Sequence, residues 1–129
     1  MYSSPPVATP LPKTIRVTNE TKSSELASRC VVASSHKARM VGLLNRASLE
    51  NGEGLLIEEC AAIHMIGMRL AIDVVFLDSD GKVLKTAENV RPWTPYVSCG
   101  GADSALELPT GAIARTKTEA GDQLTFSAA

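Results

Sequence analysis

Three residues that bind soft metals occur at intervals of four in the sequence: Cys60, His64 and Met68. Thiolate, imidazole and thioether ligands together suit copper. The two ends of this stretch lie about 25 Å apart in a strand and about 12 Å apart in a helix, so one ion can contact at most two of the three side chains. We favour the alternative, in which Cys60 and Met68 fill the core and His64 makes a structural hydrogen bond. No metal and no cofactor is therefore expected.

A carboxylate within the most apolar stretch of the chain is the second chemical feature. Asp73 lies inside 71–77, and a buried carboxylate requires a partner. We expect His64 and Asp73 to lie close together, with one arginine beside the carboxylate. This cluster serves either as an ion pair that holds a helix against the sheet or as a polar cleft that binds an anion. The candidate cations are Arg39, Arg46, Arg69 and His64.

A thiol paired with an imidazole would be a catalytic nucleophile, and Cys60 or Cys99 with His64 is the available combination. No strand–turn–helix pattern surrounds Cys99-Gly100-Gly101, so no catalytic motif is recognisable. The three cysteines are odd in number and widely spaced, which indicates free thiols in a reducing compartment. The first residues have no basic segment followed by an apolar one, so we expect a cytoplasmic protein, with association with the cell envelope as the alternative.

Four segments together resemble the bacterial and archaeal family known as domain of unknown function 192. They extend over about 26–126, and their order and spacing are more specific than any one motif. Met65 and Ala71 depart from the family pattern, in which Thr and Pro are usual. The segments are Gly42-Leu43-Leu44-Asn45-Arg46 with the preceding Arg39, Cys60 to Met68, Ile72 to Asp78 with Gly81 and Val83, and Leu106-Glu107-Leu108-Pro109 with Gly111, Gly121 and Asp122.

The resemblance implies a compact, mainly β domain with a barrel-like sheet and a short helix. It implies no established activity. It also supports an Arg–Asp pair, because both residue types occur in the matched segments. Some members are associated with envelope and pilus-assembly genes, which suggests a structural partner in such an assembly.

The elements that must position these residues are short strands. The chain has 129 residues, enough for one domain, and we expect this domain to cover 14–129 after a proline-rich leader at 1–13. Strands mostly follow strands, which predicts an α+β, mainly β fold with an antiparallel sheet. Asp80-Gly81 predicts a hairpin, and a helix over 36–45 is expected to bury three apolar side chains. These side chains are Met40, Leu43 and Leu44.

Composition excludes several classes of protein. Thirteen basic and fourteen acidic residues give a formal charge of −1, and five aromatic residues are too few for a base-stacking surface, so nucleic acid is not expected as a partner. No apolar run reaches the ~20 residues that span a bilayer. A binding or accessory domain with a small ligand or a protein partner is the function we favour. The alternatives are a thiol/His enzyme and an envelope or secretion partner that makes contact through Trp93, although a Trp more often packs over the end of a barrel.

Overall fold

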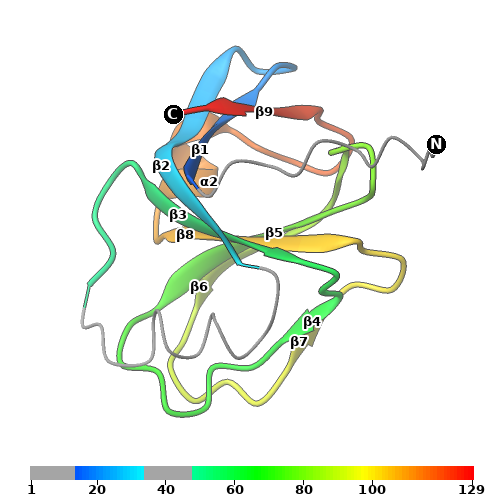
Figure 1. Cartoon of the computed structure of the whole chain (residues 1–129). Coiled ribbons are helices and arrows are strands. Elements are labelled where there is room, and N and C mark those ends of the chain that lie inside the picture. The colour runs from blue at the N-terminus through cyan, green and yellow to red at the C-terminus, as the bar shows by residue number, and fades with distance from the viewer. Residues whose placement is uncertain (1–13, 34–47) are drawn as a thin grey trace, which may run out of the picture.

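The structure, a computed structural model, describes residues 14–33 and 48–129 and consists mostly of strands (Figure 1). The predicted leader at 1–13 and the whole of the predicted helix at 36–45 lie outside the described residues. The elements are β1 Thr14–Asn19, β2 Ser24–Ala33, β3 Glu53–Glu58, β4 Ala62–Ile63, β5 Ile72–Leu77, β6 Val83–Val90, β7 Val97–Ser98, β8 Ser104–Pro109, α2 Ala112–Thr116 and β9 Leu124–Ala128.

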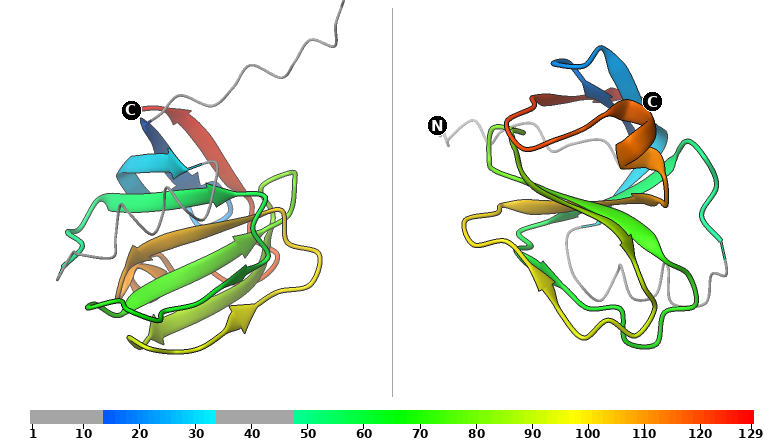
Figure 2. Two further views of the ribbon diagram at one scale, coloured as in Figure 1. Left: turned by 60° about the horizontal axis from the view of Figure 1, so that its bottom comes forward. Right: turned by 180° about the vertical axis from the view of Figure 1, so that it is seen from behind.

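Seven strands form one sheet in the order β6-β5-β8-β3-β2-β1-β9, and the sheet curls into a half-barrel (Figure 2). All neighbours in it are antiparallel except β2 and β3, which are parallel. A parallel pair needs a long crossover, and the connection 34–52 supplies it. The small strands β4 and β7 form a separate pair. The prediction of a mainly β, barrel-like and mainly antiparallel fold is confirmed.

The half-barrel closes at one corner, where the predicted Asp80-Gly81 hairpin joins β5 and β6. Here the two edge strands meet, because the backbone N–H of Val83 donates to Asp122 O (2.8 Å) and that of Leu124 donates to Gly81 O (2.9 Å). Gly81 has φ +83°, and a Cβ at this position would lie 2.7 Å from Leu124 O. Only glycine therefore fits this corner without displacement of the backbone.

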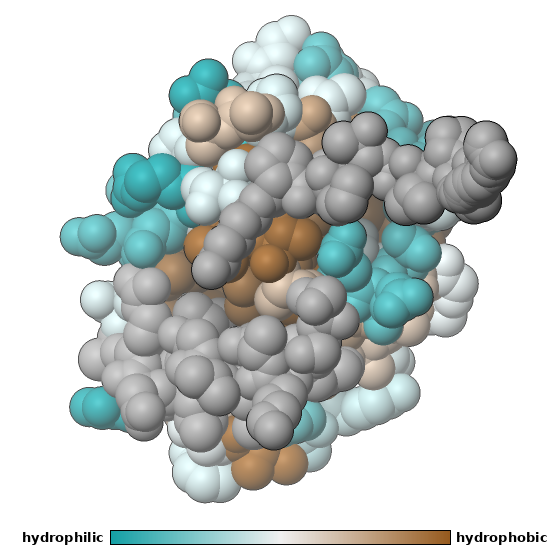
Figure 3. Space-filling model, in the orientation of Figure 1, coloured by the Kyte–Doolittle hydropathy of each residue, from teal (hydrophilic) through white to brown (hydrophobic). Residues whose placement is uncertain are grey.

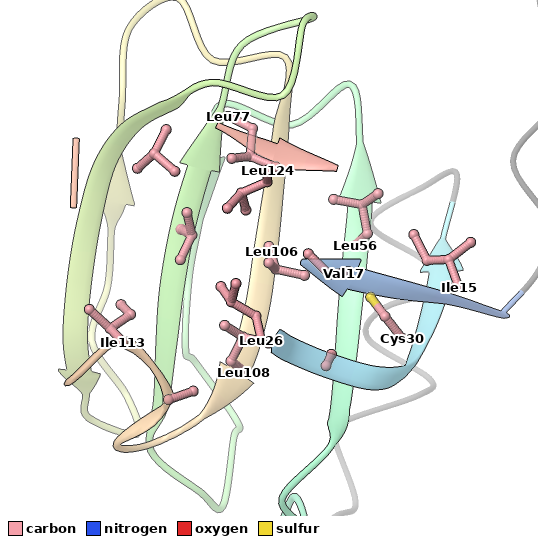
Figure 4. Packing of buried hydrophobic residues seen from close by; sticks show 14 residues of the cluster. Ile15, Val17, Leu26, Cys30, Leu56, Leu77, Leu106, Leu108, Ile113 and Leu124 are labelled. Atoms are coloured by element: carbon pink, nitrogen blue, oxygen red, sulfur yellow. The ribbon is translucent and has the colours of Figure 1, made fainter. Parts of the chain in front are cut away.

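Apolar side chains cover both faces of the central strands, so β5 and β8 are buried along their whole length. The first core lies under α2 and the curled end of the sheet (Figure 4). The second core lies on the opposite face of β5 and β8. Both cores contain alternate residues of the central strands: Leu106 and Leu108 in the first core, and Ile72, Val74 and Phe76 in the second.

Candidate functional site

Asp73 lies at the centre of the sheet, and its side chain is fully buried. Its carboxylate accepts three backbone hydrogen bonds: Oδ1 from Asn89 N (2.9 Å), and Oδ2 from Gly111 N (3.1 Å) and Ile113 N (3.0 Å). The first donor is available because β6 bulges opposite Asp73, with Asn89 in the left-handed region at φ 51°. The other two are the N–H groups at the start of α2, which carry partial positive charge. Backbone dipoles thus stabilise the buried carboxylate.

The expected ion pair at Asp73 is not formed within the described part of the chain. The ion pairs there join Arg16 with Glu25, and Lys22 with Glu119 and Asp122. Arg69, one of the proposed cations, is exposed to solvent. The other two candidate arginines, Arg39 and Arg46, lie outside the described residues, so their part of the predicted cluster stays a prediction.

The sheet separates Asp73 from the surroundings of His64. In β5, Asp73 shares a face with Val75 and is paired with Leu108, both in the first core. His64 is flanked by Ile63 and Met65, which belong to the second core on the opposite face. The neighbours of His64 in the chain thus belong to the core on the opposite face from Asp73, and the predicted proximity of His64 to Asp73 stays a prediction.

A buried carboxylate on the face of the second core was missed by the sequence analysis. Glu107 is fully buried on β8, between Leu55 of β3 and Val74 of β5. Alternation with Leu106 and Leu108 places Glu107 on the other face, which would be solvent in a sheet with one covered side. The second core covers that face, so the same pattern here indicates a buried acid.

The cysteines and methionines of the proposed soft-ligand set lie mainly in the cores. Cys60 and Met68 are buried in the second core, and the Cys60 thiol donates to Ala62 O (3.1 Å). Cys99 is half-buried, and Cys30 lies in the first core, where burial raises the pKa of its thiol to about 12. Across residues 14–33 and 48–129, no group of three or more His, Cys, Asp or Glu side chains is arranged to hold a metal ion.

A pocket of about 300 Å³ opens at the end of the sheet where β5, β6 and β8 meet the loops. Leu70 and Pro109 are buried, Leu49 and Ala71 are half-buried, and together these four residues form its apolar wall. Its polar residues are all exposed. They are Ser48, Asn89 and Thr110.

The buried carboxylate of Asp73 fixes the backbone at two places in the polar part of the pocket lining. It accepts a hydrogen bond from Asn89 itself and another from Gly111, which follows Thr110. The pocket is also where three of the segments singled out in the sequence meet. Ser48 and Leu49 follow the first of these segments, Ala71 directly precedes Ile72-Asp73, and Pro109-Thr110 belong to the last segment.

A second polar cluster, at Asp122, supports the fold. The carboxylate of Asp122 is buried and accepts hydrogen bonds from Asn19 Nδ2 (2.9 Å), Lys22 Nζ (2.8 Å) and Glu119 N (3.1 Å). Burial acts to raise the pKa of Asp122, but the hydrogen bonds from Asn19 and Lys22 outweigh it and lower the pKa below the ordinary 3.8. The cluster ties the β1–β2 turn to the loop before β9.

Two hydrogen-bonded turns expose aromatic and aliphatic side chains at the opposite end of the molecule from α2. Trp93 N donates to Met65 O and Met65 N donates to Thr94 O, both at 2.8 Å, so the two turns form one unit. Trp93, at φ 68°, is 65% exposed, and Tyr96 is 66% exposed. Of the two alternatives for Trp93, the exposed one is observed.

Comparison with known proteins identifies relatives of the chain. The model of the family DUF192, described as an uncharacterised conserved group, matches residues 17–126. A UPF0127 protein of Thermococcus sibiricus is 33% identical over 110 residues, which cover 82% of this chain and 71% of that protein. A UPF0127 protein of Pyrococcus abyssi is 31% identical over 114 residues, 84% of this chain and 94% of the relative.

Two solved structures share the fold. A protein of Sinorhizobium meliloti, provisionally described as a transcription regulator, superposes with a TM-score of 0.75 at 22% identity, covering 88% of this chain and 92% of that one. A protein of unknown function from Novosphingobium aromaticivorans gives a TM-score of 0.73 at 23% identity, covering 87% and 83%. At these identities the similarity concerns the fold alone. The curated relatives are archaeal and these structures bacterial, so the bacterial source and the cytoplasmic location stay predictions. Among the described residues, no helix has the length and apolarity to cross a membrane.

Proposed function

Since the chain belongs to the DUF192 family of uncharacterised proteins, we propose that it is a small binding domain whose ligand site is the pocket between Leu49, Ala71, Asn89 and Thr110. One observation carries the proposal: the buried carboxylate of Asp73 positions the backbone of the polar pocket wall at Asn89 and beside Thr110. A buried charge that holds the rim of a pocket is typical of a preorganised binding site.

The walls of the pocket favour a small molecule with both polar and apolar parts. A volume of about 300 Å³ is at the lower end of the range for ligand pockets. The exposed hydroxyl and amide groups supply hydrogen bonds, and the aliphatic wall supplies apolar contact. Arg46 lies two residues before Ser48 in the sequence. If the predicted arginine cleft belongs to this pocket, its positive charge favours a ligand that carries an anionic group.

A thermal-shift screen over small polar and anionic molecules tests the proposal, because a ligand that binds only the native state raises the melting temperature. Ala71→Leu fills the pocket and is expected to abolish the shift produced by any hit. The matched control is Ala120→Leu, the same change at an exposed position. A shift that persists in Ala71→Leu and in Thr110→Val would contradict the pocket as the site.

The thiol/His alternative has weaker support. Cys60 is buried, and its thiol already donates to a backbone carbonyl within its own loop. Contact with a component of the cell envelope, the other alternative, is favoured by a specific observation, the exposed side chains around Trp93.

A further inference from the structure

The strongest surface feature of the described residues is the pair of turns Met65–Met68 and Arg91–Thr94, here called the paired turns. The N–H of Met68 donates to Met65 O (3.1 Å), and Thr94 N and Oγ1 both donate to Arg91 O. These bonds, with the two between the turns, hold Ile66 and Trp93 at the tips. Met65 and Met68, at the two ends of the first turn, are buried in the second core, so core packing anchors this turn.

Three of the four large hydrophobic residues found exposed in the described part of the chain gather at this place. Ile66 is 47% exposed, Trp93 and Tyr96 are more so, and the fourth, Val31, lies on β2. Tyr96 precedes β7, which pairs with β4 just before the first turn. Figure 3 shows apolar atoms at the lower end of the molecule, the end at which these loops lie in Figure 1. Grouped exposed apolar residues mark a contact surface.

The two loops that carry the paired turns contain basic but no acidic residues. The stretches 61–72 and 89–102 contain no Asp or Glu, although the whole chain has fourteen acidic residues. They contain two arginines, Arg69 and Arg91, and both are exposed. A two-fold contact between copies of this surface would bring four arginines together, which is unfavourable. The complementary partner is therefore anionic.

We propose that the paired turns dock on an anionic lipid bilayer, with Ile66, Trp93 and Tyr96 at the interface and Arg69 and Arg91 on the headgroup phosphates. Trp and Tyr are enriched at the membrane–water boundary because their rings are apolar with a polar atom. The surface consists of turn tips, which suits a membrane surface better than an extended peptide. This inference deepens the second candidate function and does not depend on the ligand pocket.

The chain has only one tryptophan, so its fluorescence reports directly on the proposed contact. We expect the emission of Trp93 to shift to shorter wavelength with vesicles of phosphatidylcholine and phosphatidylglycerol in equal parts, and much less with phosphatidylcholine alone. Each arginine near an anionic surface strengthens binding about fivefold. The double variant Arg69→Gln/Arg91→Gln is expected to weaken vesicle binding roughly 30-fold.

The matched control is Lys82→Gln/Lys117→Gln, which removes two exposed cations from the other end of the molecule. This variant should bind vesicles like the parent, and all variants should keep the parent melting temperature. Unchanged emission and no co-sedimentation with anionic vesicles would overturn the proposal. So would equal loss in both double variants, or an emission shift that appears with a polyglutamate peptide and not with vesicles, which would indicate an acidic protein partner instead. Thermal-shift binding of small molecules is a separate readout, so the two proposals fail independently.

Discussion

The substitution Asp73→Asn tests whether the negative charge of the buried side chain stabilises the fold, or whether a neutral polar group of the same shape is sufficient. The amide has the same shape, but it offers one acceptor oxygen where the carboxylate offers two. If that oxygen faces Gly111 and Ile113, the amide NH₂ group faces the N–H of Asn89, and neither donor has an acceptor. The reverse orientation leaves two backbone donors without an acceptor.

The expected loss of stability follows from these bonds. One buried donor without an acceptor costs about 1–3 kcal/mol, and each remaining bond weakens when the acceptor loses its charge, from about 1.5–3 to about 1 kcal/mol. The lower cost of burying a neutral amide offsets part of this. We expect Asp73→Asn to lower the free energy of unfolding by about 3 kcal/mol and the Tm by roughly 10 °C.

Urea denaturation measures the change, with an unaltered slope as the sign that only stability has changed. Asp103→Asn, the same substitution at an exposed carboxylate, should remain within about 0.5 kcal/mol of the parent. Amide exchange at Asn89, Gly111 and Ile113 should accelerate in Asp73→Asn and not in the control. A loss below about 0.5 kcal/mol, with exchange at these amides unchanged, would refute the role of the carboxylate.

Two further predictions concern ionisation. Because the folded pKa of Asp122 lies below 3.8, its stabilising effect is complete above pH 3.8 and is lost as the pH falls through the folded pKa. The urea midpoint of Asp122→Asn should therefore fall less steeply between pH 5 and pH 2 than that of the parent. Parallel curves for the two proteins would contradict this. Cys30, with a thiol pKa of about 12, should resist iodoacetamide at pH 8 while half-buried Cys99 is alkylated, because the thiolate is the nucleophile. Mass spectrometry of the native and the urea-unfolded protein distinguishes the two thiols, and equal native rates would be the contrary result.

Much of the fold could be predicted from the sequence because local signals and burial agree in it. The apolar run of β5 and the Asp80-Gly81 turn lie where the sequence predicts them. The parallel pairing of β2 with β3 was not predicted, since pairing depends on the crossover and not on the strands themselves.

The candidate site was predictable in part. An acid within an apolar strand indicated that Asp73 is buried with partners. The type of partner was not visible, because backbone N–H groups carry no sequence signal and are presented here by a bulge at Asn89 and a turn at Gly111. Glu107 was missed since period-two alternation does not tell whether the second face of a sheet is covered.

The pairing of β1 with β9 has a consequence for how the protein is made. Ile15 lies opposite Ala128 and Asn19 opposite Leu124, so strands from the two ends of the described sequence are neighbours in the sheet. Contacts between such distant residues slow folding, because a long loop must close before they form. On the ribosome, the outer edge of β1 lacks its partner until β9 has emerged. Nascent chains that stall late in synthesis would therefore expose a strand edge, and truncation within β9 would favour aggregation over mere loss of stability.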